Sequence, residues 1–388
     1  MEAKFLLLSS DDKTVRVLRR VLSDLEIGFV HSSTSDDAIR RITRERFEAI
    51  IVDCADYAEA SNVMRACKAA PVNKRALSIV LVEASVGLKG GFELGAHFVL
   101  HKPLTVERAK ASFRAVRALM KSERRLQLRV PVQVPVSCLG SARYPAKTLD
   151  LCEGGMAIQF TGRVPRESDL RFSLALPGIT DKLDLWGELA WEGGGDRAGV
   201  RFTNVTDPQR KTLRTWLNSQ LPEPEPDDPP VVCRVKNFSP GACYLTTVSP
   251  FPKSTRVILS LPADKPEIRA SGVVRLTHPE FGMGIEFFRT TPEQQQQLQQ
   301  ILKALRVAGD SPEIHVAPDG LESPPENAPA PHKHKHPHSP SLADSPNQPG
   351  SNAAVDDALV HLFQQNALLP VEVFMEQMQQ TTQAHNSR

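Results

Sequence analysis

Apolar and polar residues follow two alternating periods over the first 120 residues of the chain. Short apolar runs typical of buried strands are separated by stretches in which apolar residues recur every three or four positions, as on one face of a helix. The predicted strands are 4–8, 28–30, 47–53, 78–82 and 96–100. The predicted helices are 12–25, 38–44 and 105–121. Strands that alternate with helices indicate a parallel sheet covered on both faces, so residues 1–122 are predicted to form a doubly wound α/β domain.

The pattern changes after residue 122. Apolar residues now alternate singly with polar ones in short segments, which is typical of half-buried antiparallel strands. These segments are 130–138, 146–150, 156–160, 170–176, 183–191 and 198–202. A helix follows, with Pro208 in its first turn and Trp216 on its apolar face. Residues 123–221 are therefore predicted to form a small β-barrel with a C-terminal helix.

A second copy of this pattern follows a proline-rich linker. Residues 222–230 read PEPEPDDPP and are predicted to be stiff and extended, because proline fixes φ and the acids repel one another. Beyond the linker, Gly199-Val-Arg-Phe202 returns as Gly284-Ile-Glu-Phe287, at an offset of about 85 residues that other strings share. A constant offset indicates an internal duplication, so residues 231–308 are predicted to form a second barrel with its own C-terminal helix.

The C-terminal part of the chain divides by composition. Residues 309–350 are rich in Pro, Ser, Asn and His and poor in apolar residues, so they are predicted to be a disordered linker. Residues 351–382 regain a helical apolar stripe, formed by Val355, Ala358, Leu359, Leu362 and Phe363. A second short helix that begins at Pro370 would carry Phe374 and Met378. A tethered amphipathic helix is a candidate docking segment for a protein partner. The alternative is that it packs back on the domains of its own chain.

Charge, cysteine content and hydropathy exclude several classes of protein. The chain has 47 Lys and Arg against 45 Asp and Glu, without the basic stripe of a general nucleic-acid binder, so no DNA partner is expected. Six scattered cysteines without a CxxC pair predict reduced thiols and no metal site. No apolar run approaches the ~18 residues of a membrane span. A cytoplasmic protein without membrane insertion is expected.

Two strings at and after the start of the first predicted barrel carry the candidate chemistry. They are Arg125-Leu-Gln-Leu-Arg129 and Asp150-Leu-Cys152-Glu-Gly-Gly155. Arginine offers a planar fork of donors to phosphate oxygens and a flat face that stacks on a purine. A carboxylate can accept hydrogen bonds from the N–H groups of guanine. Glycine permits a turn conformation or a close ligand approach that a β-carbon would resist.

An RxxxR loop that enters a small β-domain, followed by a [D/N]xSxxG turn, resembles the PilZ family, whose members bind the bacterial second messenger cyclic di-GMP. The resemblance implies that the arginines lie in an extended loop. The resemblance covers about 124–220 and implies ligand contacts from Arg125, Arg129, Asp150, Cys152 and Gly155, with Arg124 assisting.

Cys152 departs from the family pattern, which has Ser at this position. Loss of one neutral hydrogen bond costs ~0.5–1.5 kcal/mol, or roughly tenfold in affinity, so binding is expected to be weakened and not abolished. A further hypothesis concerns redox control. If Cys152 is exposed beside arginines, its pKa would fall and its oxidation would block the site.

The second predicted barrel lacks most of this site. Asn237-Phe-Ser239-Pro-Gly-Ala242 takes the place of the turn, with Ala242 where the family has Gly. No RxxxR string precedes it, because the acidic linker occupies that segment. No independent ligand site is expected there, only packing against the first barrel or a partner. A second RxxxR match, Arg210 to Arg214, is interpreted as helix surface.

The first 120 residues resemble a response-regulator receiver domain. Asp53 ends the third predicted strand where that family has its phosphoacceptor, and Lys102-Pro103 follows the fifth. The family's acidic pair for Mg²⁺ falls here at Ser9-Ser10, with Asp11 and Asp12 displaced, and its switch Ser/Thr falls at Glu83. Two interpretations remain open: a degenerate receiver used for dimerisation or docking, or a phosphorylatable switch in which Asp11 replaces the acidic pair.

These observations together predict a non-enzymatic bacterial signalling adaptor. The first PilZ-like domain would bind cyclic di-GMP without a cofactor, and ligand binding would reorient the receiver-like domain or recruit a protein partner. The alternative is a ligand-independent scaffold built on degenerate receiver and PilZ domains. A homodimer is a candidate assembly of the chain. An enzyme is not expected, because no phosphate-cradling glycine loop and no Ser/His/Asp set occurs in a useful context.

Overall fold

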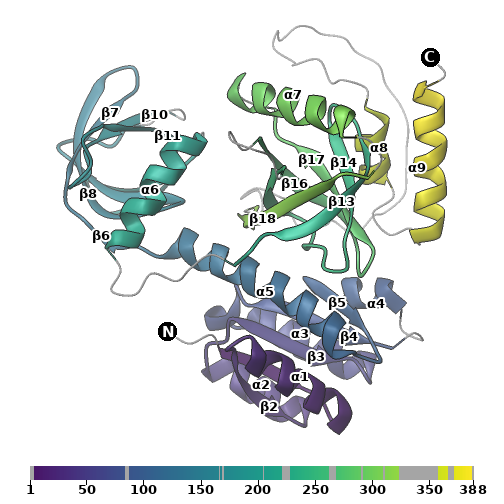
Figure 1. The fold of residues 1–388 in the computed structure, drawn as a ribbon. Helices are drawn as coiled ribbons and strands as arrows, with labels where there is room; N and C mark the ends of the chain where they lie inside the picture. The colour runs from purple at the N-terminus through teal and green to yellow at the C-terminus, as the bar shows by residue number, and fades with distance from the viewer. Residues whose placement is uncertain are drawn as a thin grey trace, which may run out of the picture.

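The computed structural model describes residues 4–83, 87–165, 167, 170–203, 205–220, 228–261, 268–289, 292–308, 311–322, 357–365 and 371–386 (Figure 1). These residues form an N-terminal α/β domain, two β-barrels and a C-terminal pair of helices. In this part of the chain no helix is both long and apolar enough to span a bilayer.

The N-terminal domain is a five-stranded parallel sheet with helices on both faces, as predicted. Its strand order is β2-β1-β3-β4-β5, one of the two common doubly wound orders. Alternate strand residues face opposite layers: Phe5 packs with the core beneath α1 and α5, and Leu6 with the core beneath α2 and α3. The elements are β1 (Lys4–Leu8), α1 (Asp12–Asp24), β2 (Gly28–Ser32), α2 (Ser35–Arg44), β3 (Ala49–Asp53), α3 (Tyr57–Ala69), β4 (Leu77–Val82), α4 (Gly87–Glu93), β5 (Phe98–His101) and α5 (Val106–Gln127).

Helix α5 joins this domain to both barrels. It continues six residues beyond the predicted end at Lys121, so Arg124 and Arg125 lie in its last turn and the prediction of an extended arginine loop was wrong there. Residues 122–127 contain no glycine or proline to end the helix, and α5 gains packing against the second barrel. Figure 1 shows α5 running from the N-terminal domain to the space between the barrels.

The first barrel is closed by pairing of β8 with β9, in the order β8-β7-β10-β11-β12-β9, with the short β6 beside β8. Its interior holds the alternate apolar residues of the strands, and α6 covers one end with Leu213, Trp216 and Leu217. The elements are β6 (Val130–Pro131), β7 (Pro135–Leu139), β8 (Arg143–Cys152), β9 (Gly155–Phe160), β10 (Leu170–Leu174), β11 (Leu183–Glu192), β12 (Arg197–Phe202) and α6 (Asp207–Ser219).

The second barrel repeats this architecture with one strand taken from a different place in the sequence. Its closed order is β13-β14-β17-β16-β15-β18. Strand β18 takes the place in the second barrel that β7 takes in the first. In the sequence, however, β7 comes before β8, whereas β18 comes after helix α7. The elements are β13 (Val231–Phe238), β14 (Ala242–Thr246), β15 (Thr255–Ser260), β16 (Arg269–His278), β17 (Gly282–Phe287), α7 (Pro292–Val307) and β18 (Glu313–Leu321).

Strand β18 corrects the predicted boundary at residue 308 and the prediction of disorder from 309. Residues Glu313–Leu321 pair with both β13 and β15, and Ile314 and Val316 enter the core. The segment that would supply this strand in the order of the first barrel is the proline-rich linker, whose prolines lack the N–H groups that a barrel strand donates to its neighbours. A later strand closes the barrel instead. The remainder of 309–350, apart from 311–322, lies outside the described residues, as do residues 222–227 of the linker.

The C-terminal segment forms two helices, α8 (Ala358–Gln365) and α9 (Val371–Asn386), beside the second barrel (Figure 1). Most of the predicted apolar face is confirmed, since Leu359, Leu362, Phe363, Phe374 and Met378 are buried. Ala358 is exposed instead, and Val355 lies outside the described residues. The buried residues pack against the second barrel of the same chain. The alternative of packing back on the chain's own domains is therefore the arrangement seen, and the face is not free for a partner here.

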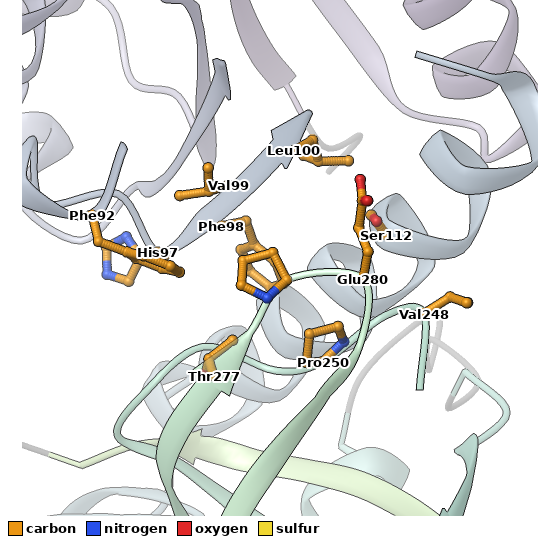
Figure 2. A pocket seen from close by; sticks show the side chains of 11 residues that line it. Phe92, His97, Phe98, Val99, Leu100, Ser112, Val248, Pro250, Thr277 and Glu280 are labelled. Carbon is orange, nitrogen blue, oxygen red and sulfur yellow. The ribbon is translucent and has the colours of Figure 1, made fainter. Parts of the chain in front are cut away.

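The second barrel also contacts the N-terminal domain beside β5. Figure 2 shows the turn at Glu280 and the loop at Val248 and Pro250 facing Phe98 and Leu100, around a small pocket. The Glu280 carboxylate forms an ion pair with Arg108 of α5. His101, which directly precedes Lys102, lies 3.6 Å from the same carboxylate. Burial and the nearby Arg108 lower the pKa of His101, so Arg108 is the charged partner of Glu280 near neutral pH.

Candidate functional site

The arginine string spans the end of α5 and the entrance to the first barrel. Arg124 and Arg125 lie in the last helical turn, Leu128 caps the helix, and Arg129 precedes β6. Arg124 turns away from the barrel, because its Nη2 donates to Oε1 of Glu48 in the N-terminal domain at 2.6 Å. The structure therefore separates Arg124 from the other two arginines.

Arg125 faces a buried carboxylate that sequence reasoning did not select. Its Nε lies 3.9 Å from Oε1 of Glu153, whose side chain is only 4% exposed. Arg214 of α6 binds the same carboxylate with two bonds of 3.0 Å, from Nε and Nη2. The interpretation of Arg214 as helix surface was wrong. The available signal was an acid inside the Asp150–Gly155 turn, close to a cluster of arginines.

Arg129 and Asp150 form a more exposed pair. Arg129 Nη1 donates to Asp150 Oδ1 at 2.5 Å, and the same oxygen accepts the Ala157 N–H at 3.2 Å. The Asp150 hydrogen bond raises the pKa of Arg129 despite partial burial, so the guanidinium stays charged. Exposed ion pairs contribute about 0–1 kcal/mol to stability, so separating Arg129 from Asp150 costs little free energy.

Cys152 lies inside the turn and not on its surface. Its residue is 4% exposed, and its thiol donates to the Gly155 carbonyl at 3.2 Å. Burial raises the pKa of Cys152 and outweighs the opposite effect of Arg129. The redox hypothesis required an exposed thiol of lowered pKa, so it was wrong.

Gly155 is required by strand packing in this structure. Its φ is not positive, so the turn alone does not demand glycine. A β-carbon at this position would overlap the carbonyl oxygen of Val200, on the neighbouring strand β12. Glycine here allows β9 and β12 to pair.

The arginines adjoin a group of charges that connects the two barrels. We call Arg125, Glu153, Arg214, Arg210 and Asp319 the junction cluster. Asp319 on β18 accepts from Arg210 Nη1 at 3.1 Å and lies 4.0 Å from Arg214 Nη2. Nearby, Glu123 of α5 accepts the Leu321 N–H at 2.5 Å. The end of α5 therefore contacts the arginine site and β18 of the second barrel together.

The N-terminal domain brings Asp53 and Lys102 together, as the resemblance implied. Lys102 Nζ donates to the two Asp53 oxygens at 3.1 and 3.2 Å, and Ser9 Oγ donates to Oδ2 at 2.7 Å. Lys102 also lies 3.7 Å from Asp11 and 3.9 Å from Glu83. One ammonium group is thus surrounded by three carboxylates.

In the second barrel, Asn237–Ala242 takes the place of the Asp150–Gly155 turn and is held by hydrogen bonds within itself. Ser239 Oγ accepts the N–H groups of Gly241 and Ala242 at 3.3 and 3.0 Å. The Gly241 N–H also donates to Asp357 of the C-terminal segment. Among the described residues, no group of three or more His, Cys, Asp or Glu side chains is arranged to hold a metal ion.

Comparison with known proteins matched the two barrel regions to a protein family and about 30% of the chain to solved receiver domains and response regulators. Residues 123–219 and 221–304 match the family model described as PilZ domain. The receiver domain of a sensor histidine kinase from Pseudomonas aeruginosa is similar at 18% identity and a TM-score of 0.28, covering 31% of this chain and 99% of that one. Chemotaxis response regulator CheY4 of Vibrio cholerae is similar at 18% identity and a TM-score of 0.28, covering 30% and 99%. The comparison with curated proteins found no match.

Proposed function

We propose, from the two PilZ domains that this chain carries, that it is a bacterial signalling adaptor whose first PilZ domain binds cyclic di-GMP. The observation that supports this proposal most is the position and pairing of Arg125 and Arg129, the two arginines of the RxxxR string. Both lie beside the Asp150–Gly155 turn, and each has a carboxylate neighbour, Glu153 or Asp150. A phosphate or guanine of the ligand offers the same kind of contact as these carboxylates.

The charge arrangement lets Arg125 change partner at low cost. Removing one member of a buried ion pair usually costs about 3–5 kcal/mol, because the other charge stays buried and unpaired. Glu153 has two bonds from Arg214, so it remains paired when Arg125 turns to a ligand phosphate. At the same time the exposed Arg129–Asp150 pair would open, and Asp150 would accept from a guanine N–H.

The same geometry supports a relay to the other domains. Leu126, next to Arg125 on α5, lies close to Gly154 of the first barrel and Gly320 of the second. A change in the last turn of α5 would move contacts with both barrels at once. Ligand binding would thus reorient the first barrel relative to the α5–β18 unit, and a protein partner would read that change.

Glu153→Gln should bind cyclic di-GMP more tightly than the wild type, by about three- to tenfold. The neutral amide holds Arg125 less strongly, and a charged contact contributes roughly 1 kcal/mol beyond a neutral one. Isothermal titration calorimetry measures the change. Asp184→Asn is the matched control, because Asp184 pairs with Arg171 across β10 and β11, two strands that are not bonded to the turn strands β8 and β9. Weaker binding by Glu153→Gln at an unchanged melting temperature would refute competition between Glu153 and the ligand.

The N-terminal domain fits a receiver that has lost phosphoryl transfer. Mg²⁺ at such a site needs carboxylate ligands, but Ser9 is neutral and is bonded to Asp53. Asp11, the candidate replacement, caps α1 by accepting from Lys13 N–H and Thr14 Oγ1 at 3.0 and 2.6 Å. The residues present therefore do not fit the ion, and Lys102 neutralises Asp53 instead. The domain acts in this proposal as a docking body for α5 and the second barrel.

Incubation with acetyl phosphate and Mg²⁺ should leave the chain unphosphorylated. The Asp53 side chain is 3% exposed and has hydrogen bonds from Ser9 and Lys102, so it is poorly placed to attack. Phosphate-affinity gel electrophoresis checks the result, with Asp53→Asn as the control. A shifted band in the wild type that Asp53→Asn removes would restore the switch interpretation.

A further inference from the structure

The C-terminal helices are seated on the outside of the second barrel in a surface shaped for them. Leu359, Leu362 and Phe363 of α8 pack with Phe374 and Met378 of α9 against Ala242, Tyr244 and Leu276. The Phe374 ring is tilted against two other rings, with its centroid 5.2 Å from that of Tyr244 and 4.8 Å from that of His278. We call this outer face of β14, β17 and β16 the tail groove. The side chains from both partners are almost fully buried.

Two glycines of the barrel make room for the segment. A β-carbon on Gly284 would lie 2.8 Å from the Phe363 ring, and one on Gly241 would lie 2.6 Å from an Asp357 oxygen. Neither glycine has a positive φ, so the backbone does not require glycine at either position. Their small size is explained by the seated segment. Gly241 directly precedes Ala242, the residue that takes the position of Gly155 in the second barrel.

A buried polar contact fixes the register of the segment. Asp357 Oδ2 accepts the Gly241 N–H at 2.7 Å, and its Oδ1 accepts from Leu359 N–H at 3.1 Å and Val360 N–H at 3.3 Å. The carboxylate therefore caps α8 and anchors it to the turn of the barrel. An aspartate followed by apolar residues two, five and six places later is a recognisable pattern.

In the first barrel, Gly199 corresponds to Gly284 and is covered by a side chain of the barrel itself. Gly199 pairs with Trp191 across β12 and β11, and the Trp191 ring fills the space over Gly199. In the second barrel, Gly284 pairs with the smaller Leu276, and Phe363 of the tail fills that space. The duplicated barrels thus differ in whether this face is closed by their own side chain.

We propose that the tail groove is a helix-binding site and that helices α8, with its Asp357 cap, and α9 are its separable ligand. Thirty-four residues, 323–356, separate the end of the barrel at Glu322 from Asp357, so contacts and not chain continuity place the segment. The groove then selects an amphipathic helix with an aspartate cap and the apolar pattern of this tail. A partner helix of that chemistry would compete with the tail for the groove.

The test uses the full chain with a protease site introduced between residues 330 and 345. After the folded protein is cut, a fluorescent peptide of residues 353–386 should exchange for the tail and bind one to one, as measured by anisotropy. A Phe363→Ala peptide should bind at least about a hundredfold more weakly, since a buried aromatic ring is lost. A Val373→Ala peptide is the matched control, because Val373 is exposed, and should bind normally.

Three results of the peptide exchange would overturn the proposal. The first is a cut tail that neither leaves nor exchanges, and the second is a tail that leaves without the peptide binding in its place. The third is a Val373→Ala peptide weakened as much as the Phe363→Ala peptide. If the uncut chain is instead a dimer that Phe363→Ala dissociates, the groove holds the tail of a second copy and the assignment within one chain fails.

Discussion

Replacing Arg125 and Arg129 together by alanine should lower the affinity for cyclic di-GMP by more than about a hundredfold. Each arginine is expected to give the ligand a charge-assisted contact of about 1.5–3 kcal/mol. The fold should survive, because Glu153 keeps both bonds from Arg214 and Asp150 keeps the Ala157 N–H. Calorimetric titration measures the affinity, and small-angle scattering at saturating ligand should show a change in domain arrangement for the wild type alone.

The control for this experiment is a double variant of two other arginines on the same barrel. Arg171 pairs with Asp184 across β10 and β11, and Arg143 donates to Ser137 Oγ at the end of β8 remote from the turn. Their replacement by alanine changes the net charge equally and should leave binding intact. Wild-type affinity in the Arg125/Arg129 variant would show that these arginines are only a solvated surface. No heat from the wild type would favour the ligand-independent scaffold.

Gly155→Ala should destabilise the first barrel by about 3 kcal/mol. The added methyl group overlaps the Val200 carbonyl oxygen, and neither strand can move without breaking the β9–β12 ladder. For a domain of about 100 residues, this lowers the melting temperature by roughly 12–20 °C. Differential scanning calorimetry of the full chain should show one transition shifted down.

Gly154→Ala is the neighbouring control. A β-carbon on Gly154 would lie 3.5 Å from the Leu126 carbonyl oxygen, which is ordinary contact, so its melting temperature should be nearly unchanged. The pair of variants also separates two roles for the signature glycine. If Gly155→Ala melts like the wild type but no longer binds ligand, close approach of the ligand is the reason for glycine and strand packing is not.

The local pattern of the sequence was sufficient for the classes of element and for the motif. Period-two alternation predicted two barrels, and alternating strands and helices predicted the N-terminal domain. Two of its helices, α3 and α4, were missed. Helix α3 does carry a buried face at helical spacing, formed by Ala60, Val63, Met64 and Cys67, whereas α4 has three glycines in seven residues. The end of α5 was placed too early because a helix without a stop signal continues where tertiary packing supports it.

The tertiary contacts of the site residues could not be predicted from the local sequence pattern. Glu153 was passed over although it stands inside the motif, because nothing local shows that it meets Arg214, 61 residues later. Gly155 was assigned to a turn or a ligand, whereas its neighbour is a carbonyl on another strand. Cys152 was given the option of exposure, whereas the barrel buries it.

The sequence by itself determined the three folded units, the duplicated barrel, the arginine string and the apolar face of the tail. The units, the arginine string and the apolar face follow from the period and spacing of residues a few positions apart, and the duplication follows from strings repeated at a constant offset. Only the tertiary structure decided that β18 closes the second barrel, that Glu153 holds Arg125 and Arg214, and that the tail covers Gly241 and Gly284. These contacts join segments up to 116 residues apart, and their geometry follows from closure of the barrels.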